Sequence, residues 1–227
     1  MGESKASKKK TFIQHDNKIL AFVQTILKST LCVLGWHAFL TVGLPLRMKM
    51  SSPDRFDNFV EYEHTEFAFL LSFIVLALDI LWHINGLLSE KVHHAVTATI
   101  LYLTYNGSPV VRSYQVMNFI MESIAPFYQL IKWRYKPHMI RHLAIFVNCF
   151  VRVPYILFVS IPMLFSDLWM HMIEEKLDKE GDVIVPWIWL LSFLCCFVFL
   201  GLDFIWTKSM LQSITRHNDN KSKTKVF

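Results

Sequence analysis

The sequence has only four cysteines among 227 residues, and their positions exclude several common kinds of site. No pair has the C-x-x-C spacing of a redox or zinc motif, and no pair is placed to bridge an aqueous loop. The HExxH pattern of zinc hydrolases is also absent. Cys32, Cys149, Cys195 and Cys196 all fall in apolar stretches, so we interpret them as packing residues.

The first ten residues carry no targeting or lipidation signal. "MGESKASKKK" lacks the apolar core of a signal peptide, so the first apolar segment is expected to stay in the mature protein. Myristoylation is not expected either, because Ala6 occupies the position where the motif needs Ser or Thr.

Apolar residues, in contrast, are abundant: the chain is 53% hydrophobic and 15% aromatic. They form blocks too long and too continuous for a soluble domain of this size. We therefore predict an all-α fold, a polytopic membrane bundle of about six transmembrane helices. The third block has about 14 residues, fewer than the roughly 20 needed to cross the hydrocarbon, so it must borrow flanking residues or lie inside the bundle. The six blocks are residues 19–42, 67–88, 92–105, 110–131, 142–165 and 183–206.

The basic residues predict the orientation of these helices. With the amino terminus in the cytosol, most Lys and Arg residues fall in cytosolic segments, whereas the last lumenal loop, "DLWMHMIEEKLDKEGD", is acidic. Both termini are then cytosolic, as an even number of spans requires. The predicted organisation is a basic cytosolic amino terminus (1–18), a membrane domain (19–206) and a basic cytosolic tail (207–227).

The tail ends in "KTKVF", which places Lys223 and Lys225 in the K-x-K-x-x pattern of coat-protein retrieval signals. This pattern favours the endoplasmic reticulum membrane, with the coat-protein retrieval machinery as a partner. The alternative is a basic tail attracted to anionic lipid.

Ionisable residues inside the apolar blocks are costly unless they are paired or hydrated, so they mark candidate functional positions. Asp79, Glu122 and Arg152 lie nine or ten residues from the cytosolic ends of their blocks, which is roughly 14 Å at 1.5 Å per residue. All three are therefore expected near the bilayer midplane, facing a common hollow, where they can share a charged network. The alternative is that Glu122 and Arg152 only hold helices together.

A second polar group is expected nearer the cytosol, at roughly 3 to 8 Å by the same measure. It contains His83, His93, His94 and Asp203. His83 follows Asp79 by four residues, so the carboxylate can orient the imidazole on the same helical face. The neighbours His93 and His94 point about 100° apart and are expected not to face the same point of a cavity. The alternative for this pair is a solvated position at the membrane interface.

Two prolines coincide with these charges. Pro126 cannot donate a hydrogen bond to the carbonyl of Glu122, and Pro154 follows Arg152 by two residues. Broken helices are tolerated in membranes where they line a cavity or pack on protein, so both kinks are expected beside an internal pocket. The tryptophans lie mostly near the block ends and are interpreted as interface residues.

Three segments carry these residues in order. They are "LDILWHINGLLSEKVHHAVTATI", "ESIAPFYQLIKW" and "NCFVRVPYILF". Together, over about residues 67–206, they resemble the TLC-domain family, which includes ceramide synthases, translocation-associated membrane proteins and the endoplasmic reticulum protein of one neuronal ceroid lipofuscinosis. The H-D-x-x-D segment of ceramide synthases is missing, and the second segment is closer to the ceroid lipofuscinosis branch, although Ile124 and Ala125 replace its Ser and Thr.

The resemblance implies a helical barrel with a lipid cavity open to the cytosol. It implies acyl transfer from acyl-CoA to a sphingoid base or lysophospholipid, with acyl-CoA as co-substrate and no bound cofactor or metal. His93 or His94 would be the general base or acyl acceptor, and Glu122 would position the acceptor. The substrate-binding residues would be Asp79, His83, Arg152 and Asp203. The alternative is a non-enzymatic lipid-binding protein that regulates membrane composition or cargo export. Membrane lipids are the expected ligands, and no nucleic acid is expected.

Overall fold

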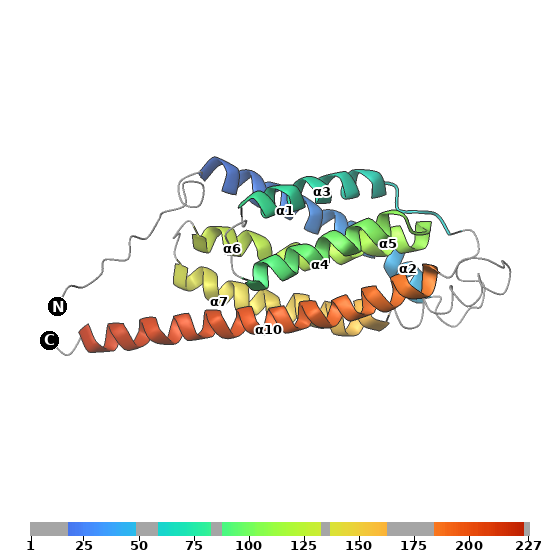
Figure 1. Cartoon of the computed structure of the whole chain (residues 1–227). Helices are drawn as coiled ribbons and strands as arrows, with labels where there is room; N and C mark the ends of the chain where they lie inside the picture. The colour runs from blue at the N-terminus through green and yellow to red at the C-terminus, as the bar shows by residue number, and fades with distance from the viewer. Residues whose placement is uncertain (1–17, 49–58, 83–87, 133–136, 163–183, 225–227) are drawn as a thin grey trace, which may run out of the picture.

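The computed structural model describes residues 18–48, 59–82, 88–132, 137–162 and 184–224. Within these ranges the chain is helical apart from short turns and has no strand, which confirms the predicted all-α class. The helices form six stretches (Figure 1). They are α1–η1–α2 (Lys18–Ala38, Phe39–Gly43, Leu44–Met48), α3 (Thr65–Trp82), α4 (Leu88–Tyr105), α5–η2–α6 (Pro109–Asn118, Phe119–Ile124, Ala125–Lys132), α7–η3–α8–η4 (Pro137–Val147, Asn148–Arg152, Val153–Tyr155, Ile156–Ser160) and α10 (Ile184–Thr224).

Three of the described helices are long and apolar enough to cross a membrane, and they indicate a membrane protein. These are Ile19–Met48, Met139–Ser160 and Leu194–Thr215. The third apolar block does borrow flanking residues, because α4 begins at Leu88 and has 18 residues. At 1.5 Å per residue it is about 27 Å long, close to the thickness of the hydrocarbon core.

A proline lies two residues after the end of each irregular segment of the described helices. Pro45 has no N–H for the helix, and just before it the Leu44 N–H reaches back five residues to the Phe39 carbonyl, which makes η1 a π-helix. Near Pro154, the Val153 N–H also reaches back five residues, to the carbonyl of Asn148, the first residue of the π-helix η3. Pro126 has the opposite effect, because η2 before it is a tighter 3-10 helix. Pro162 likewise follows the π-helix η4, so the prolines locate the four breaks of the described helices.

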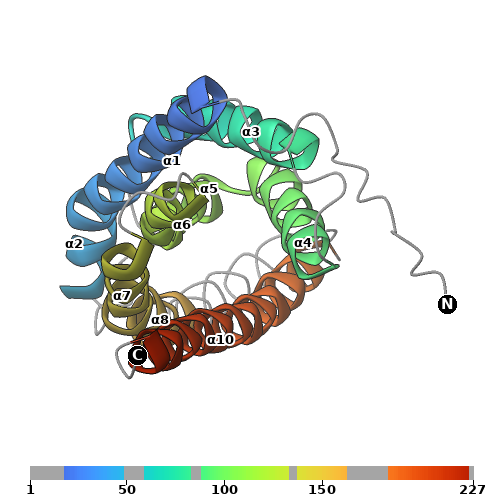
Figure 2. The same cartoon turned by 90° about the vertical axis from the view of Figure 1, so that its left-hand side faces the viewer.

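The helices surround a central one. Along the circle α1 contacts α3, α3 contacts α4, α4 contacts α10 and α10 contacts α7. The Arg47 guanidinium of α2 completes the circle by donating to the Phe158 carbonyl of η4 at 3.0 Å. Figure 2 shows α5 and α6 inside this circle. The first turn of α1 and the last turn of α10 lie at the same end of the bundle (Figure 1).

The first stretch packs on the central one at very short range. A Cβ atom built on Gly35 of α1 would lie 2.7 Å from the Ile120 nitrogen of η2, so only glycine allows this backbone approach. Ala38 of α1 and Val116 and Ile120 on the facing side are completely buried. The side of α5–η2 that faces α1 is thus filled with apolar side chains.

The central stretch begins where two helix-start signals coincide. Ser108 is the N-cap of α5, its hydroxyl accepts the Val111 N–H at 3.5 Å, and Pro109 occupies the first helical position. Residues 59–64, which lead into α3, are anchored to the start of α5 because the Tyr62 N–H donates to the Ser113 hydroxyl at 3.0 Å. Burial and the neighbouring Glu63 raise the pKa of Tyr62, so its hydroxyl stays protonated and bonds His37 at 2.9 Å.

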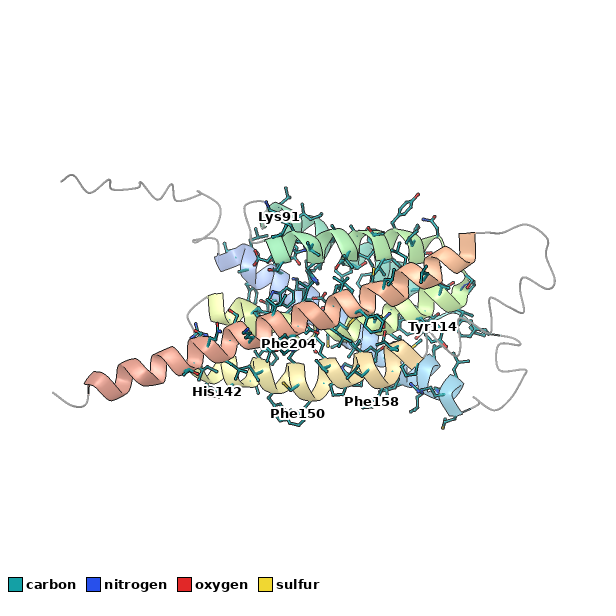
Figure 3. The ribbon with its side chains drawn as sticks, turned by 60° about the horizontal axis from the view of Figure 1, so that its bottom comes forward. Lys91, Tyr114, His142, Phe150, Phe158 and Phe204 are labelled. Carbon is teal, nitrogen blue, oxygen red and sulfur yellow. The ribbon has the colours of Figure 1, made fainter. Side chains whose placement is uncertain are left out.

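The outer surface of the bundle is apolar. Phe150 and Phe158 of the fifth stretch and Phe204 of α10 are 68%, 70% and 72% exposed (Figure 3). In water such side chains would form large unfavourable patches, whereas acyl chains solvate them.

The predicted boundary between membrane domain and tail, at residues 206 and 207, is not a structural boundary. Helix α10 continues without a break to Thr224. Met210 and Ile214 are buried, and Met210 packs with Ile124 and Ala144. The helix continues because "TKSMLQSI" keeps an apolar residue every three or four positions, and this face belongs to the core.

Candidate functional site

An interior cavity of about 100 Å³ lies among the helices and is lined from all six stretches. Its walls are mainly apolar, with Leu76, Leu101 and Phe199 from three different helices. Its polar lining is Ser72 and Asp79 of α3, His93, His94, Thr97 and Thr104 of α4, Tyr114, Gln115 and Asn118 of α5, Glu122 of η2 and Arg152 of η3.

Most of the site residues predicted from the sequence line this cavity. Asp79, Glu122 and Arg152 come from three stretches and all line it, so the expected common hollow is present among the described residues. His83 lies outside the described residues. The functional roles assigned to these side chains stay predictions.

His93 and His94 both line the cavity, and the prediction that they do not face the same point of it stays a prediction. Adjacent helical residues point about 100° apart, so a cavity placed between their two directions is about 50° from each. Their ring centroids are 5.4 Å apart in an edge-to-face arrangement. His93 also contacts the rings of Phe199 and Trp206 of α10, both at 5.4 Å. Packing on α10 therefore holds the pair at the cavity wall.

Asp79 forms an ion pair that the sequence analysis missed. Lys28 of α1 donates to its carboxylate at 2.5 Å, and Gln24 donates to the other oxygen at 3.1 Å. Lys28 lies nine residues into the first apolar block, about 14 Å from Ile19, at the level expected for Asp79. A lysine inside an apolar block was the signal that could have revealed it.

The Arg152 guanidinium pairs with Asp203 and not with Glu122 or Asp79. Its Nε donates to the Asp203 carboxylate at 2.8 Å, and both side chains are almost fully buried. The single network expected for Asp79, Glu122 and Arg152 is thus two separate ion pairs. Asp203 does not line the cavity, and it pairs with Arg152, a member of the group expected deeper in the membrane.

The break before Pro126 gives Arg152 its second acceptor. The Ala125 N–H donates to the Glu122 carbonyl three residues back, so the Met121 carbonyl loses its usual helical donor. Arg152 Nη1 donates to this Met121 carbonyl at 2.9 Å. The Glu122 carbonyl is thus satisfied by the Ala125 N–H, which corrects the expectation that the proline leaves it free, and Arg152 bonds the neighbouring carbonyl of Met121.

Glu122 differs from the other carboxylates. Among the residues that the structure describes, its carboxylate has no hydrogen bond or ion pair, although it lines the cavity. In the described part of the chain the interior charges are two cations, Lys28 and Arg152, and three carboxylates, Asp79, Asp203 and Glu122. If all were ionised, the cluster would carry one net negative charge. Glu122 is therefore the carboxylate left to interact with a ligand or a proton.

Three further polar residues of the central helix face the cavity: Tyr114, Gln115 and Asn118. With Glu122 they follow a three- to four-residue spacing, so they form one polar stripe. This spacing can be read in "YQVMNFIME", but none of the three residues was predicted to belong to the site. Ser160 of η4 donates to Asn118 Oδ1 at 2.9 Å and thereby fixes this amide.

The remaining predicted residues fall outside this site. The backbone of Lys223 belongs to α10, but its side chain and the whole of Lys225 lie outside the described residues. In the described part of the chain no group of three His, Cys, Asp or Glu side chains is placed to hold a metal ion.

No family model, curated protein or solved structure matches this chain. The resemblance to TLC-domain proteins therefore depends only on the residues quoted for it.

Proposed function

We propose that this protein is a membrane-embedded lipid acyltransferase whose six helical stretches all cross the bilayer as a barrel-like bundle. One observation carries the proposal: His93, His94 and Glu122 line one interior cavity, and within the described residues the Glu122 carboxylate forms no hydrogen bond or ion pair. Buried ionisable groups in a membrane protein are costly, and they are found where they pair or act on a ligand. Asp79 and Asp203 have cationic partners, so Glu122 is the carboxylate that we assign to the ligand, beside the two histidines of the cavity wall.

The proposed reaction transfers an acyl group from acyl-CoA to the hydroxyl or amine of a second lipid. One imidazole removes the proton of the acceptor while the acceptor oxygen or nitrogen attacks the thioester carbonyl. The tetrahedral intermediate then expels the coenzyme A sulfur, which takes the proton from the imidazolium. An ester or amide and free coenzyme A are the products, and Glu122 accepts a hydrogen bond from the acceptor to orient it.

The volume of the cavity limits what it holds. About 100 Å³ is well below the roughly 300–1,000 Å³ of pockets for whole drug-sized ligands. We therefore assign to it only the reacting ends of the two lipids, with their chains extending between helices.

Reconstitution tests this proposal. Purified protein in vesicles is given labelled acyl-CoA with long-chain amines and lysolipids, and wild type is compared with His93→Ala and His94→Ala. We expect at least one variant to lose about 10²–10⁴-fold in turnover, the usual contribution of a general base. His142→Ala is the matched control, because His142 is exposed on α7 outside the cavity lining (Figure 3). Equal turnover in all four proteins would contradict the proposal.

The second candidate is a lipid-binding protein without turnover. It is favoured by the small cavity and by the two internal ion pairs, which need no ligand to balance them. Saturable lipid binding by wild type, with no product from any acceptor, would select this function.

We also propose that the protein resides in the endoplasmic reticulum with both termini in the cytosol. The support is the K-x-K-x-x pattern at Lys223 and Lys225. Replacing both lysines with serine should move a tagged protein to later compartments. An unchanged distribution would assign the basic tail to lipid attraction.

A further inference from the structure

The cavity wall opposite the histidine helix carries two side-chain amides. Gln115 and Asn118 lie three residues apart on α5, so they are neighbours on one helical face, and both line the cavity. Gln115 is only 8% exposed, yet within the described residues nothing bonds its amide. The amide therefore faces the cavity with its hydrogen-bonding groups unused by the described residues, and a ligand that bonds them is stabilised there.

The Asn118 amide is oriented. The buried Ser160 hydroxyl donates to its Oδ1 at 2.9 Å, and Ser160 is only 3% exposed. With the oxygen end of the amide held by η4, the N–H₂ end is left as the donor available to the cavity. A donor fixed before the ligand arrives loses no orientational freedom on binding, which is the condition for strong stabilisation of a developing negative charge.

We infer that Gln115 and Asn118 form a subsite for the oxygen of an acyl carbonyl, with Ser160 as its positioning residue. Under the proposed function, the carbonyl is that of the acyl-CoA thioester. The two amides donate to its oxygen while the acceptor attacks, and they stabilise the negative charge of the tetrahedral intermediate. The histidines lie on a separate helix, α4, so base and carbonyl donors approach the reacting carbon from different walls.

The first experiment measures acyl transfer in the reconstituted protein. Asn118→Leu keeps the size of the side chain and removes its donor, and turnover should fall about 10²–10³-fold with little change in KM for acyl-CoA. Ser160→Ala should lower turnover less, and Ser160→Thr should restore it because the hydroxyl returns. The control is Asn106→Leu, which removes an exposed amide at the end of α4. Unchanged turnover in Asn118→Leu and Gln115→Leu would overturn the inference.

The second experiment does not depend on turnover. An acyl-CoA analogue whose sulfur is replaced by CH₂ presents a ketone that cannot transfer its acyl group, and a ¹³C label isolates its carbonyl stretch in infrared difference spectra. In wild type this band should lie below its position in plain vesicles, and in Asn118→Leu the shift should be reduced. A shifted band without acyl transfer would reject the proposed function but keep the carbonyl subsite. Identical bands in both proteins, or no binding by wild type, would overturn the subsite.

Discussion

Single charged residues define the interior of this protein. The sequence predicted Asp79, Glu122 and Arg152 inside, because their distance along each helix gives a depth. It could not predict their partners, since depth says nothing about the direction in which a side chain points. Lys28 and Asp203 satisfy two of the three charges through contacts 51 residues apart in sequence.

The Lys28–Asp79 pair is expected to behave as a buried salt bridge. Lys28→Met leaves Asp79 with an uncompensated charge, and we expect a loss of about 3–5 kcal/mol in unfolding free energy. Lys28→Met with Asp79→Leu removes both charges and should recover most of this loss. The coupling free energy is measured by unfolding four proteins in detergent: wild type, Lys28→Met, Asp79→Leu and the double variant. Additive losses in the double variant would show that the two groups do not act as a pair.

At the scale of the helices, Pro126 and Pro154 predicted where two of the breaks lie but not their kind, and the breaks before Pro45 and Pro162 were not predicted. Before Pro126 the break is a 3-10 turn in which the Ala125 N–H bonds the Glu122 carbonyl, whereas the segment near Pro154 widens to a π-helix. The choice depends on tertiary contacts such as the bond from Arg152 to Met121, which the sequence does not reveal. Helix α10 continues beyond Trp206, where the last apolar block ends, because Met210 and Ile214 are buried although few apolar residues follow Trp206.

The approach of α1 to η2 gives a test with a matched control. Gly35→Ala adds a methyl group 2.7 Å from the Ile120 nitrogen, and the helices must separate. We expect a loss of about 1–3 kcal/mol in unfolding free energy, typical of overpacking. Gly201→Ala makes the same change on exposed α10, where nothing lies within 4 Å, and should be neutral or stabilising by about 0.5–1 kcal/mol. Equal thermal shifts in the two variants would contradict this packing.

At the scale of the molecule, the six apolar blocks located the six helical stretches of the described residues, but not their arrangement around α5 and α6. That arrangement depends on side-chain contacts such as the one at Gly35, and block hydrophobicity does not encode them. The proposed topology adds that every stretch crosses the bilayer, including α4, whose outward-facing residues are partly polar.

The crossing of α4 can be tested with single cysteines at its two ends. In a background without the four native cysteines, Lys91→Cys and Asn106→Cys replace exposed residues near the start and just after the end of α4. In sealed microsomes an impermeant maleimide should label position 91 at once and position 106 only after permeabilisation. Labelling of both positions before permeabilisation would mean that α4 does not span the membrane.

The central claim is that the interior cavity, and not the apolar outer surface, receives the reacting end of a lipid. The most direct measurement is photo-crosslinking in vesicles with a fatty acyl probe that carries a diazirine next to its carbonyl, followed by peptide mass spectrometry. We predict adducts on α4 and α5–η2, near His94 and Asn118, that unlabelled lipid displaces. Adducts confined to outer residues such as Phe150 and Phe204 (Figure 3), and not displaced by unlabelled lipid, would contradict the claim.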